Sequence, residues 1–377
     1  MAAVAGVIFS NLHDRNITEL THMRTMAAVP FGCRYRLVDF ALSNMVNANI
    51  TNISVITHYN YHSLMDHIGS GKDWDLARRK GGIKILPPFV TAYANHSNTL
   101  YNSRLEALQS VSYLLDFDEP YVVLSDCDAI CNVDLSAMIA EHIDSGADMT
   151  CAVHRVNADT FDTGSHVVYR SDDDGNITGI ELYNPSLTGS QDISMNIMVF
   201  KTQFLRDALL DARAHNFTSF HRDVIAGGIG RCKFRVYRHD GYFANIKSFL
   251  DYFALNMDLA QNKAARDELF GMKNRPIYTK VRNSPPTKYV GESTVKDSLI
   301  ADGCIIEGTV ENSILFRGVR VGKNTVVRNS ILFQDTYTGS NVYLNCVVSD
   351  KNVVIRDGRV LSGHETMPFY IEKGKMI

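Results

Sequence analysis

The run VKDSL at residues 295–299 returns as VENSI at 310–314, VRNSI at 327–331 and YLNCV at 343–347. The copies start 15, 17 and 16 residues apart, and short aliphatic bursts between Gly and Asn residues separate them. This repeat predicts a parallel β-helix. An antiparallel β-meander is the alternative, although a meander should show strict two-residue alternation along each strand.

A proline-bearing stretch precedes the repeat and divides the chain. Pro276, Pro285 and Pro286 lie in it, and we assign residues 266–289 to a linker. The β-helix then occupies residues 290–377, and a first domain occupies residues 1–265. A chain of 377 residues has room for two domains.

The first domain alternates short apolar runs with helical patterns. Residues 4–9, 53–57 and 121–124 have the character of buried strands, and residues 37–49 have the apolar spacing of a helix. Such alternation predicts an α/β fold, with a parallel sheet covered by helices on both faces. The turn sequence at 174–176, between two β-rich runs, predicts a hairpin that extends the sheet at one side.

The composition excludes several partners. Hydrophobic residues make up 45% of the chain and charged residues 21%, and the net charge is -3, so no basic surface for nucleic acid or anionic membrane is expected. The N-terminal residues do not resemble a signal peptide, and no apolar run is long enough to span a bilayer. We expect a cytoplasmic protein whose seven scattered cysteines are buried free thiols.

Residues 27–44, AAVPFGCRYRLVDFALSN, resemble the signature of bacterial ADP-glucose pyrophosphorylases, which are also called glucose-1-phosphate adenylyltransferases. The resemblance continues through residues 67–74, 121–135 and 241–259 and into the repeat. It implies a Rossmann-like, GT-A-like nucleotidyltransferase domain with a mixed sheet, followed by a left-handed parallel β-helix. The family joins ATP and glucose 1-phosphate to give ADP-glucose and pyrophosphate in glycogen biosynthesis.

The phosphate loop of that family resembles GGxGxRL, because glycines let backbone N–H groups approach a triphosphate. Here Asn11, Leu12 and Asp14 stand at the glycines and Asn16 at the arginine. A branched Leu and an anionic Asp would obstruct and repel a triphosphate, and the lost arginine removes a contact of about 1.5–3 kcal/mol. The family's catalytic lysine corresponds to Met26, so we expect no catalytic residue in this chain.

The metal site implied by the resemblance is also incomplete. Two carboxylates hold magnesium in such sites. The first corresponds to Asp128, a vestigial ligand whose other interpretation is a surface acid at a strand end, and the second corresponds to Asn245, which is neutral. We therefore expect that this chain requires no cofactor and that Mg²⁺ serves a catalytic partner.

The substrate contacts implied by the resemblance are weakened as well. Asn184 stands where the family has a sugar-phosphate lysine, whereas Arg222 and Asp223 keep a cation and a carboxylate that could retain a weak sugar-phosphate contact. On the adenine side the family's residues become Phe89-Val90 and SRLEA at 103–107. An arginine and a leucine in the latter stretch would intrude on the nucleotide.

These changes point to a non-catalytic regulatory or structural subunit of the GlgD-type class. It would join a catalytic ADP-glucose pyrophosphorylase subunit in a mixed tetramer and stimulate it, while being inactive alone. Two alternatives remain. One is a weakly active adenylyltransferase that has re-invented its site with Arg24, Arg104 or Lys247, and the other is a sugar-phosphate effector-binding module that uses Arg222 and Asp223.

Overall fold

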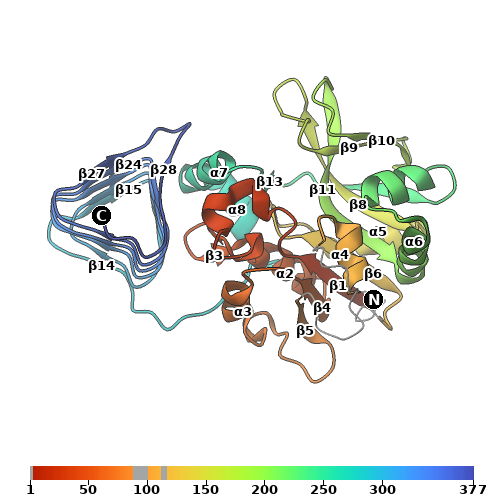
Figure 1. Cartoon of the computed structure of the whole chain (residues 1–377), viewed down its shortest axis with the longest axis horizontal. Helices are drawn as coiled ribbons and strands as arrows, with labels where there is room; N and C mark the ends of the chain where they lie inside the picture. Colours follow the sequence, from red (N-terminus) through yellow and green to blue (C-terminus); the bar gives the residue numbers. More distant parts are fainter. Residues whose placement is uncertain (1–2, 88–100, 112–116) are drawn as a thin grey trace.

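A sheet domain and a β-helix lie side by side in the computed structural model, which describes residues 3–87, 101–111 and 117–377 (Figure 1). Helices α7 (Phe249–Gln261) and α8 (Lys263–Phe270) follow the sheet domain in the chain. The first β-helix strand is β14 (Lys288–Tyr289). The domain limits at residues 265 and 290 stay a prediction, and α8 continues past the first of them to Phe270.

The sheet of the first domain has nine strands and is mixed. Strands β5, β4, β1 and β6 lie next to one another in parallel, and β11 continues the sheet antiparallel to β6. Beyond β11 lie the β9–β10 hairpin and the pair formed by β8 and β12. The strands are β1 (Val4–Phe9), β4 (Asn52–Ile56), β5 (Gly82–Leu86), β6 (Tyr121–Asp126), β8 (Met149–Asn157), β9 (Val167–Ser171), β10 (Ile177–Leu182), β11 (Ser190–Lys201) and β12 (Phe234–Arg238).

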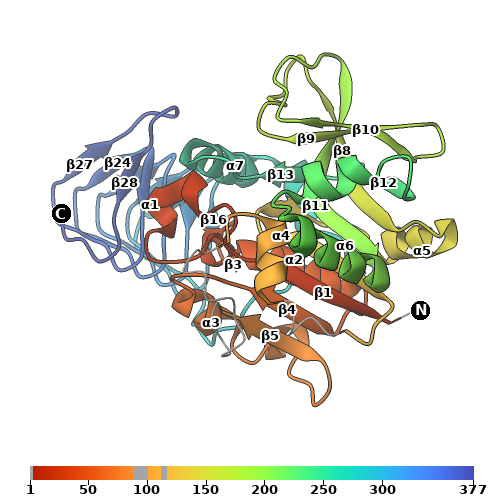
Figure 2. The same cartoon turned by 45° about the vertical axis from the view of Figure 1, so that its right-hand side comes forward.

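Helices cover both faces of this sheet, as the alternating pattern predicts. Along β1, Val7 and Phe9 belong to the apolar cluster that includes α4 (Arg104–Ser110) and α6 (Thr202–His215). Ile8 belongs to the cluster on the other face, with α2 (Leu37–Asn47) and α5 (Leu135–Ser145). Figure 2 shows α4 and α6 side by side over the sheet. The predicted hairpin is confirmed as β9 and β10, with its turn at residues 172–176.

The C-terminal domain is a β-helix with three five-stranded parallel sheets. Parallel pairing in all three sheets rules out the meander, because a meander pairs its neighbours antiparallel. The apolar residues of successive turns stack inside the helix, as Val310 pairs in register with Val327 and Val327 with Leu344. The first sheet consists of β14, β17 (Ile305–Ile306), β20 (Arg320–Val321), β23 (Tyr337–Thr338) and β26 (Val354–Ile355). The second consists of β15 (Thr294–Lys296), β18 (Thr309–Glu311), β21 (Val326–Arg328), β24 (Tyr343–Asn345) and β27 (Val360–Ser362). The third consists of β16 (Leu299–Ile300), β19 (Ile314–Leu315), β22 (Ile331–Leu332), β25 (Val347–Ser349) and β28 (Phe369–Ile371).

One corner of the β-helix is a column of glycines on successive turns. A Cβ atom on Gly308 would collide with the carbonyl oxygen of Thr325, and one on Gly322 would collide with the carbonyl oxygen of Gly339. A Cβ atom on Gly339 would in turn meet Asp357. Only glycine lets the turns approach so closely at this corner.

The two domains share one apolar core at their junction. Phe316 and Phe333 of the β-helix belong to the same cluster as α2 and α7, and the ring of Tyr252 on α7 lies 6.4 Å from that of Phe333. The Tyr252 hydroxyl donates a hydrogen bond of 2.6 Å to the carbonyl oxygen of Pro30. The β-helix is therefore packed against the first domain through buried side chains.

A buried ion pair crosses the same junction. Nη2 of Arg24 donates to both carboxylate oxygens of Asp350, at 2.7 and 2.8 Å, and both side chains are less than 5% exposed. The Tyr370 hydroxyl donates a further bond of 3.0 Å to Asp350. This pair ties the segment just before Met26 to the β-helix.

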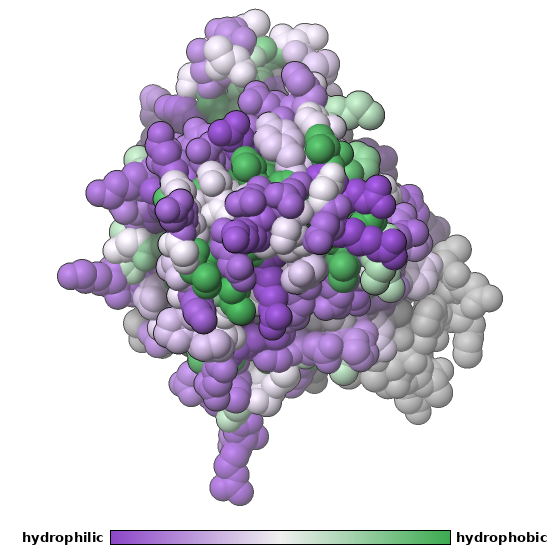
Figure 3. All heavy atoms as spheres, turned by 90° about the vertical axis from the view of Figure 1, so that its left-hand side faces the viewer, coloured by the Kyte–Doolittle hydropathy of each residue, from purple (hydrophilic) through white to green (hydrophobic). Residues whose placement is uncertain are grey.

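The outer face of the β-helix is mainly hydrophilic, with small separate apolar patches (Figure 3). Among the described helices, none has both the length and the apolar character needed to cross a membrane.

Candidate functional site

The phosphate-loop position meets two acidic residues, Asp126 at the end of β6 and Asp128 just after it, at one edge of the sheet. β1 and β6 run parallel, with Phe9 opposite Asp126, so the segments that follow both strands lie at the same edge. Ligands of open α/β sheets bind at the carboxyl ends of the strands. The geometry thus brings the degenerate loop at residues 10–16 to Asp128, the acidic residue that the sequence singles out.

The loop uses its polar side chains to bond the protein itself. Oδ1 of Asn11 accepts a 2.8 Å hydrogen bond from the Tyr101 hydroxyl, and Oδ1 of Asp14 accepts one of 2.6 Å from the backbone N–H of Met26. Asn11 is 8% exposed and Met26 is fully buried. The groups at two glycine positions and at the lysine position are therefore built into the structure rather than directed at a ligand.

The other two loop residues contribute little to a polar site. Leu12 is half-buried and packs on the apolar cluster that includes α4 and α6. Asn16 lies in a short 3-10 helix, Asp14–Ile17, where its backbone N–H bonds the carbonyl oxygen of His13 at 3.0 Å. The backbone N–H of Asp14 likewise bonds the carbonyl oxygen of Asn11 at 3.3 Å, so these two donors are already used within the loop.

Asp14 differs from the sequence expectation in its charge. Burial raises the pKa of its carboxyl group to about 7, although the hydrogen bond from Met26 and the nearby His13 oppose the shift. Near neutral pH the carboxyl group is then only partly ionised. The expectation that Asp14 repels a triphosphate as a full anion needs this correction, because burial disfavours its charged form.

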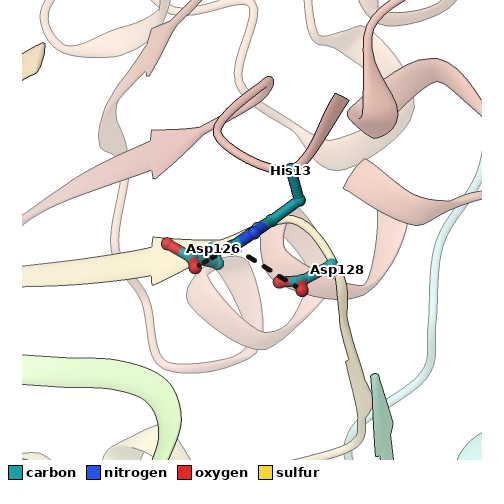
Figure 4. A group of neighbouring side chains, drawn as sticks. All are labelled: His13, Asp126 and Asp128. Carbon is teal, nitrogen blue, oxygen red and sulfur yellow. Dashed lines mark hydrogen bonds and ion pairs between the residues drawn. The ribbon is translucent and has the colours of Figure 1, made fainter. Parts of the chain in front are cut away.

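Asp126 and His13, which the sequence reasoning missed, form the centre of the site (Figure 4). His13 Nε2 donates a 2.8 Å hydrogen bond to Oδ2 of Asp126 and lies 3.7 Å from Oδ2 of Asp128. Burial lowers the pKa of His13, but Asp128 and Asp126 outweigh it and leave that pKa raised. In the described part of the chain, these three residues form a group whose donor atoms all lie within 4.8 Å of one another.

Arg104 completes this charge cluster. It begins α4, whose first turn is capped by the Ser103 hydroxyl. Nε of Arg104 donates to Oδ1 of Asp126 at 2.8 Å, and its Nη2 donates to Oδ2. Burial alone would raise the pKa of Asp126, but Arg104 and His13 hold it well below its usual range. The expected intrusion is wrong for Leu105, which is fully buried in the apolar core because the helix turns it toward the sheet.

The two family metal positions lie on neighbouring segments but differ in state. Asp128 is 1% exposed, which rules out the surface-acid interpretation, and its Oδ2 has no hydrogen-bond partner among the described residues. Asn245 ends β13 (Phe243–Asn245) opposite Ala129 of β7 (Ala129–Cys131), and its Oδ1 is hydrogen-bonded to His166 Nε2 at 3.0 Å. Magnesium prefers carboxylate ligands, so this pair does not fit the family's ion.

His166 is held neutral by its surroundings. Burial lowers the pKa of His166, and the charge of Lys247 adds to that effect, although the contact with Asn245 opposes it. Asn245 therefore interacts with a neutral imidazole in place of a cation.

The sugar-phosphate positions are occupied by local contacts. Oδ1 of Asn184 accepts a 3.0 Å bond from the backbone N–H of Ser186. Arg222 is 61% exposed, and its Nε and Nη2 donate to the two carboxylate oxygens of Asp223 at 2.7 and 3.0 Å. The interpretation of Arg222 as a solvated surface arginine agrees with this exposure.

Two of the three cations considered for a re-invented site are already paired. Arg24 binds Asp350 at the domain junction, and Arg104 binds Asp126.

Residues 89 and 90, considered on the adenine side, lie outside the described residues. All seven cysteines are free, as predicted, and six of them are buried, whereas Cys232 is only partly buried.

Comparisons with known proteins agree with the fold. The family described as "Nucleotidyl transferase" matches residues 15–229, and "GlmU-like, C-terminal hexapeptide" matches residues 285–366. "Glycogen biosynthesis protein GlgD" of Geobacillus stearothermophilus is 36% identical over 98% of this chain and 96% of its own length. The protein of that name in Bacillus subtilis is 32% identical over 98% and 95%. "Glucose-1-phosphate adenylyltransferase" of Pseudothermotoga lettingae is 32% identical over 87% and 77%.

Proposed function

Because the chain belongs to the nucleotidyl transferase family, in the group of the GlgD proteins and glucose-1-phosphate adenylyltransferases, we propose that it acts in glycogen biosynthesis as a non-catalytic subunit. It joins a catalytic glucose-1-phosphate adenylyltransferase subunit in a mixed tetramer and raises the activity of that subunit. Mg²⁺ serves the catalytic partner, and this chain requires no cofactor of its own.

The observation that carries this proposal is the self-contained phosphate loop. Asn11 and Asp14 bond Tyr101 and Met26, and His13 bonds Asp126. Phosphoryl and nucleotidyl transfer depend on positioned cations and free backbone donors around the phosphates. A loop whose polar side chains are committed to such internal contacts supports a subunit whose contribution is binding rather than chemistry.

The junction of the domains supports the binding role. The apolar core around Phe333 and Tyr252 and the buried Arg24–Asp350 pair join the two domains. A complete fold beside an incomplete reaction centre is the combination expected of a chain that contributes surfaces to an assembly.

The test compares three preparations: this chain, the catalytic relative from the same organism, and the two co-expressed. Each receives ATP, glucose 1-phosphate and Mg²⁺, and pyrophosphate release is measured per catalytic chain. We expect background activity from this chain alone, and higher activity from the co-purified complex than from the catalytic relative. Substantial turnover by the pure chain would contradict the proposal, as would failure of the two chains to co-purify.

A fourth preparation tests whether this chain itself becomes active in the complex, as opposed to stimulating the catalytic subunit. This chain is co-expressed with a catalytic relative whose own catalytic lysine is changed to alanine. We expect that complex to assemble and to be inactive. Turnover by that complex would favour the weakly active adenylyltransferase over the non-catalytic subunit.

A further inference from the structure

Arg104 and His13 lie against the two carboxylates at the end of β6, those of Asp126 and Asp128. We propose that the Arg104 guanidinium, supported by His13, takes the place of a divalent cation at Asp126 and Asp128, and that removing Arg104 exposes a latent transition-metal site. The site would consist of His13 Nε2, Asp126 Oδ2 and Asp128 Oδ2 (Figure 4).

The carboxylate of Asp126 is already paired with Arg104. Arg104 donates to both of its carboxylate oxygens, and the two side chains are 14% and 1% exposed. Buried carboxylates require a paired charge and good hydrogen bonds, because desolvation penalises an unpaired ion heavily. The guanidinium supplies both in its planar, two-pronged geometry.

The carboxylate of Asp128 is not fully hydrogen-bonded. Its side chain is buried, yet Oδ2 lacks a hydrogen-bond partner among the described residues and faces His13 Nε2 at 3.7 Å. A buried acceptor without a partner costs free energy, so such atoms call for an explanation. A buried carboxylate oxygen without a hydrogen-bond partner, beside a histidine and a second carboxylate, is available as a ligand atom.

The spacing of the three donor atoms is close to that of metal ligands. The separations from His13 Nε2 are 2.8 Å to Asp126 and 3.7 Å to Asp128. A metal with bonds of about 2.0–2.2 Å holds neighbouring ligand atoms roughly 3–4 Å apart. The set of one imidazole and two carboxylates suits Mn²⁺, Co²⁺ or Zn²⁺ better than Mg²⁺, which takes oxygen ligands.

Arg104 prevents this binding in the natural chain. A second cation at Asp126 would lie beside the guanidinium in a buried place, where repulsion between like charges is poorly screened. The arginine is also fixed by the chain at the start of α4, so it occupies the site at any metal concentration. This inference rests on the proposed non-catalytic role, since a permanent cation closes the site to catalysis.

The test titrates metal-free full-length protein with Mn²⁺ and measures binding by calorimetry and by the electron paramagnetic resonance of free Mn²⁺. We expect Arg104→Gln to bind one ion per chain at least tenfold more tightly than the natural chain. Adding Asp128→Asn or His13→Ala to Arg104→Gln should remove the gain. Arg104→Lys keeps the charge and should bind no better than the natural chain, and the matched surface variant Arg222→Gln should change nothing.

Two results would overturn the inference: binding by the natural chain as tight as by Arg104→Gln, or no gain in Arg104→Gln that is folded by circular dichroism. If Arg104→Gln does not fold, Arg104→Met keeps the aliphatic stem and carries the same expectation. The readout is metal binding and not turnover. The metal-site inference can therefore fail even if the chain has no activity of its own and still stimulates a catalytic partner. Failure of the proposed function would instead appear in the turnover assays.

Discussion

The domain junction and the site at the carboxyl ends of β1 and β6, here called the strand-end site, both bury charged side chains. They differ in how many hydrogen bonds those side chains receive. At the junction Asp350 accepts two bonds from Arg24 and one from Tyr370. At the strand-end site Asp126 is fully paired, whereas Oδ2 of the neighbouring Asp128 has no hydrogen-bond partner in the described structure. Both carboxylate oxygens of Asp350 are hydrogen-bonded at the junction, whereas one oxygen of Asp128 is not. Nη1 of Arg24 also has no hydrogen-bond partner among the described residues. The following experiments probe this difference.

The largest effect is expected from breaking the junction pair. Asp350→Ala leaves the Arg24 guanidinium buried without its partner, and removing one member of a buried pair costs about 3–5 kcal/mol. The free energy of unfolding from denaturant titration measures this loss. Glu311→Ala is the matched control, since its pair with Arg328 is exposed and should contribute less than about 1 kcal/mol. Equal losses in the two variants would show that the junction pair is not special.

At the strand-end site, the expected effect is a dependence of the free energy of unfolding on pH. The pKa of Asp14 is about 7 in the folded chain, against a usual 3.8, so the folded state favours the protonated carboxyl group. This stabilisation is complete below about pH 4 and is lost as the pH rises through 7. At about 1.4 kcal/mol per pKa unit, the loss has an upper limit of about 4 kcal/mol.

Asp14→Asn tests this dependence, because the amide keeps an acceptor for Met26 and does not titrate. We expect the free energy of unfolding of the natural chain to fall relative to that of the variant between pH 5 and pH 8. Parallel pH profiles for the two proteins would contradict the raised pKa.

A smaller effect sharpens the picture of the junction. Tyr252→Phe removes the hydroxyl that bonds the carbonyl oxygen of Pro30, which should reduce the free energy of unfolding by about 1–2 kcal/mol, since a buried acceptor is left without a partner. Tyr337→Phe provides the comparison, because Tyr337 is 45% exposed on the β-helix. Similar losses in the two variants would show that burial of the hydroxyl does not matter.

The smallest effect is expected at the surface remnant of the sugar-phosphate site. Arg222→Ala breaks a pair with Asp223 in which the arginine is 61% exposed, so the free energy of unfolding should change by no more than about 1 kcal/mol. Stimulation of a catalytic partner should also be unchanged. A lost stimulation with normal stability would revive the sugar-phosphate effector module.

Periodicity made much of the fold predictable. The apolar run at residues 4–9 coincides with β1, and the helical spacing after residue 37 coincides with α2. The repeat predicted the β-helix because each turn must stack its apolar residues on the next. These signals are local, or recur at a fixed interval, and a sequence displays them directly.

The site was predictable only where a residue of the family is missing. Met26 and Asn245 stand at known family positions, so the loss of the lysine and of the carboxylate can be read from the sequence. The cluster of His13 and Asp126 cannot be read in that way, because its members lie far apart in the sequence. His13 and Asp126 are 113 residues apart and meet only through the parallel pairing of β1 with β6. Asp126 precedes Asp128 by two residues, and this spacing was the one available signal.

The glycine column of the β-helix has a consequence for how this domain can change over evolutionary time. Gly308, Gly322 and Gly339 each sit where the next turn leaves no room for a side chain. Within this β-helix the turns already differ in length at the glycine corner, where four residues (322–325) fill the space that two residues (307–308) fill one turn earlier. Homologous β-helices should therefore keep glycine at the close contacts and vary in length in the residues beside them.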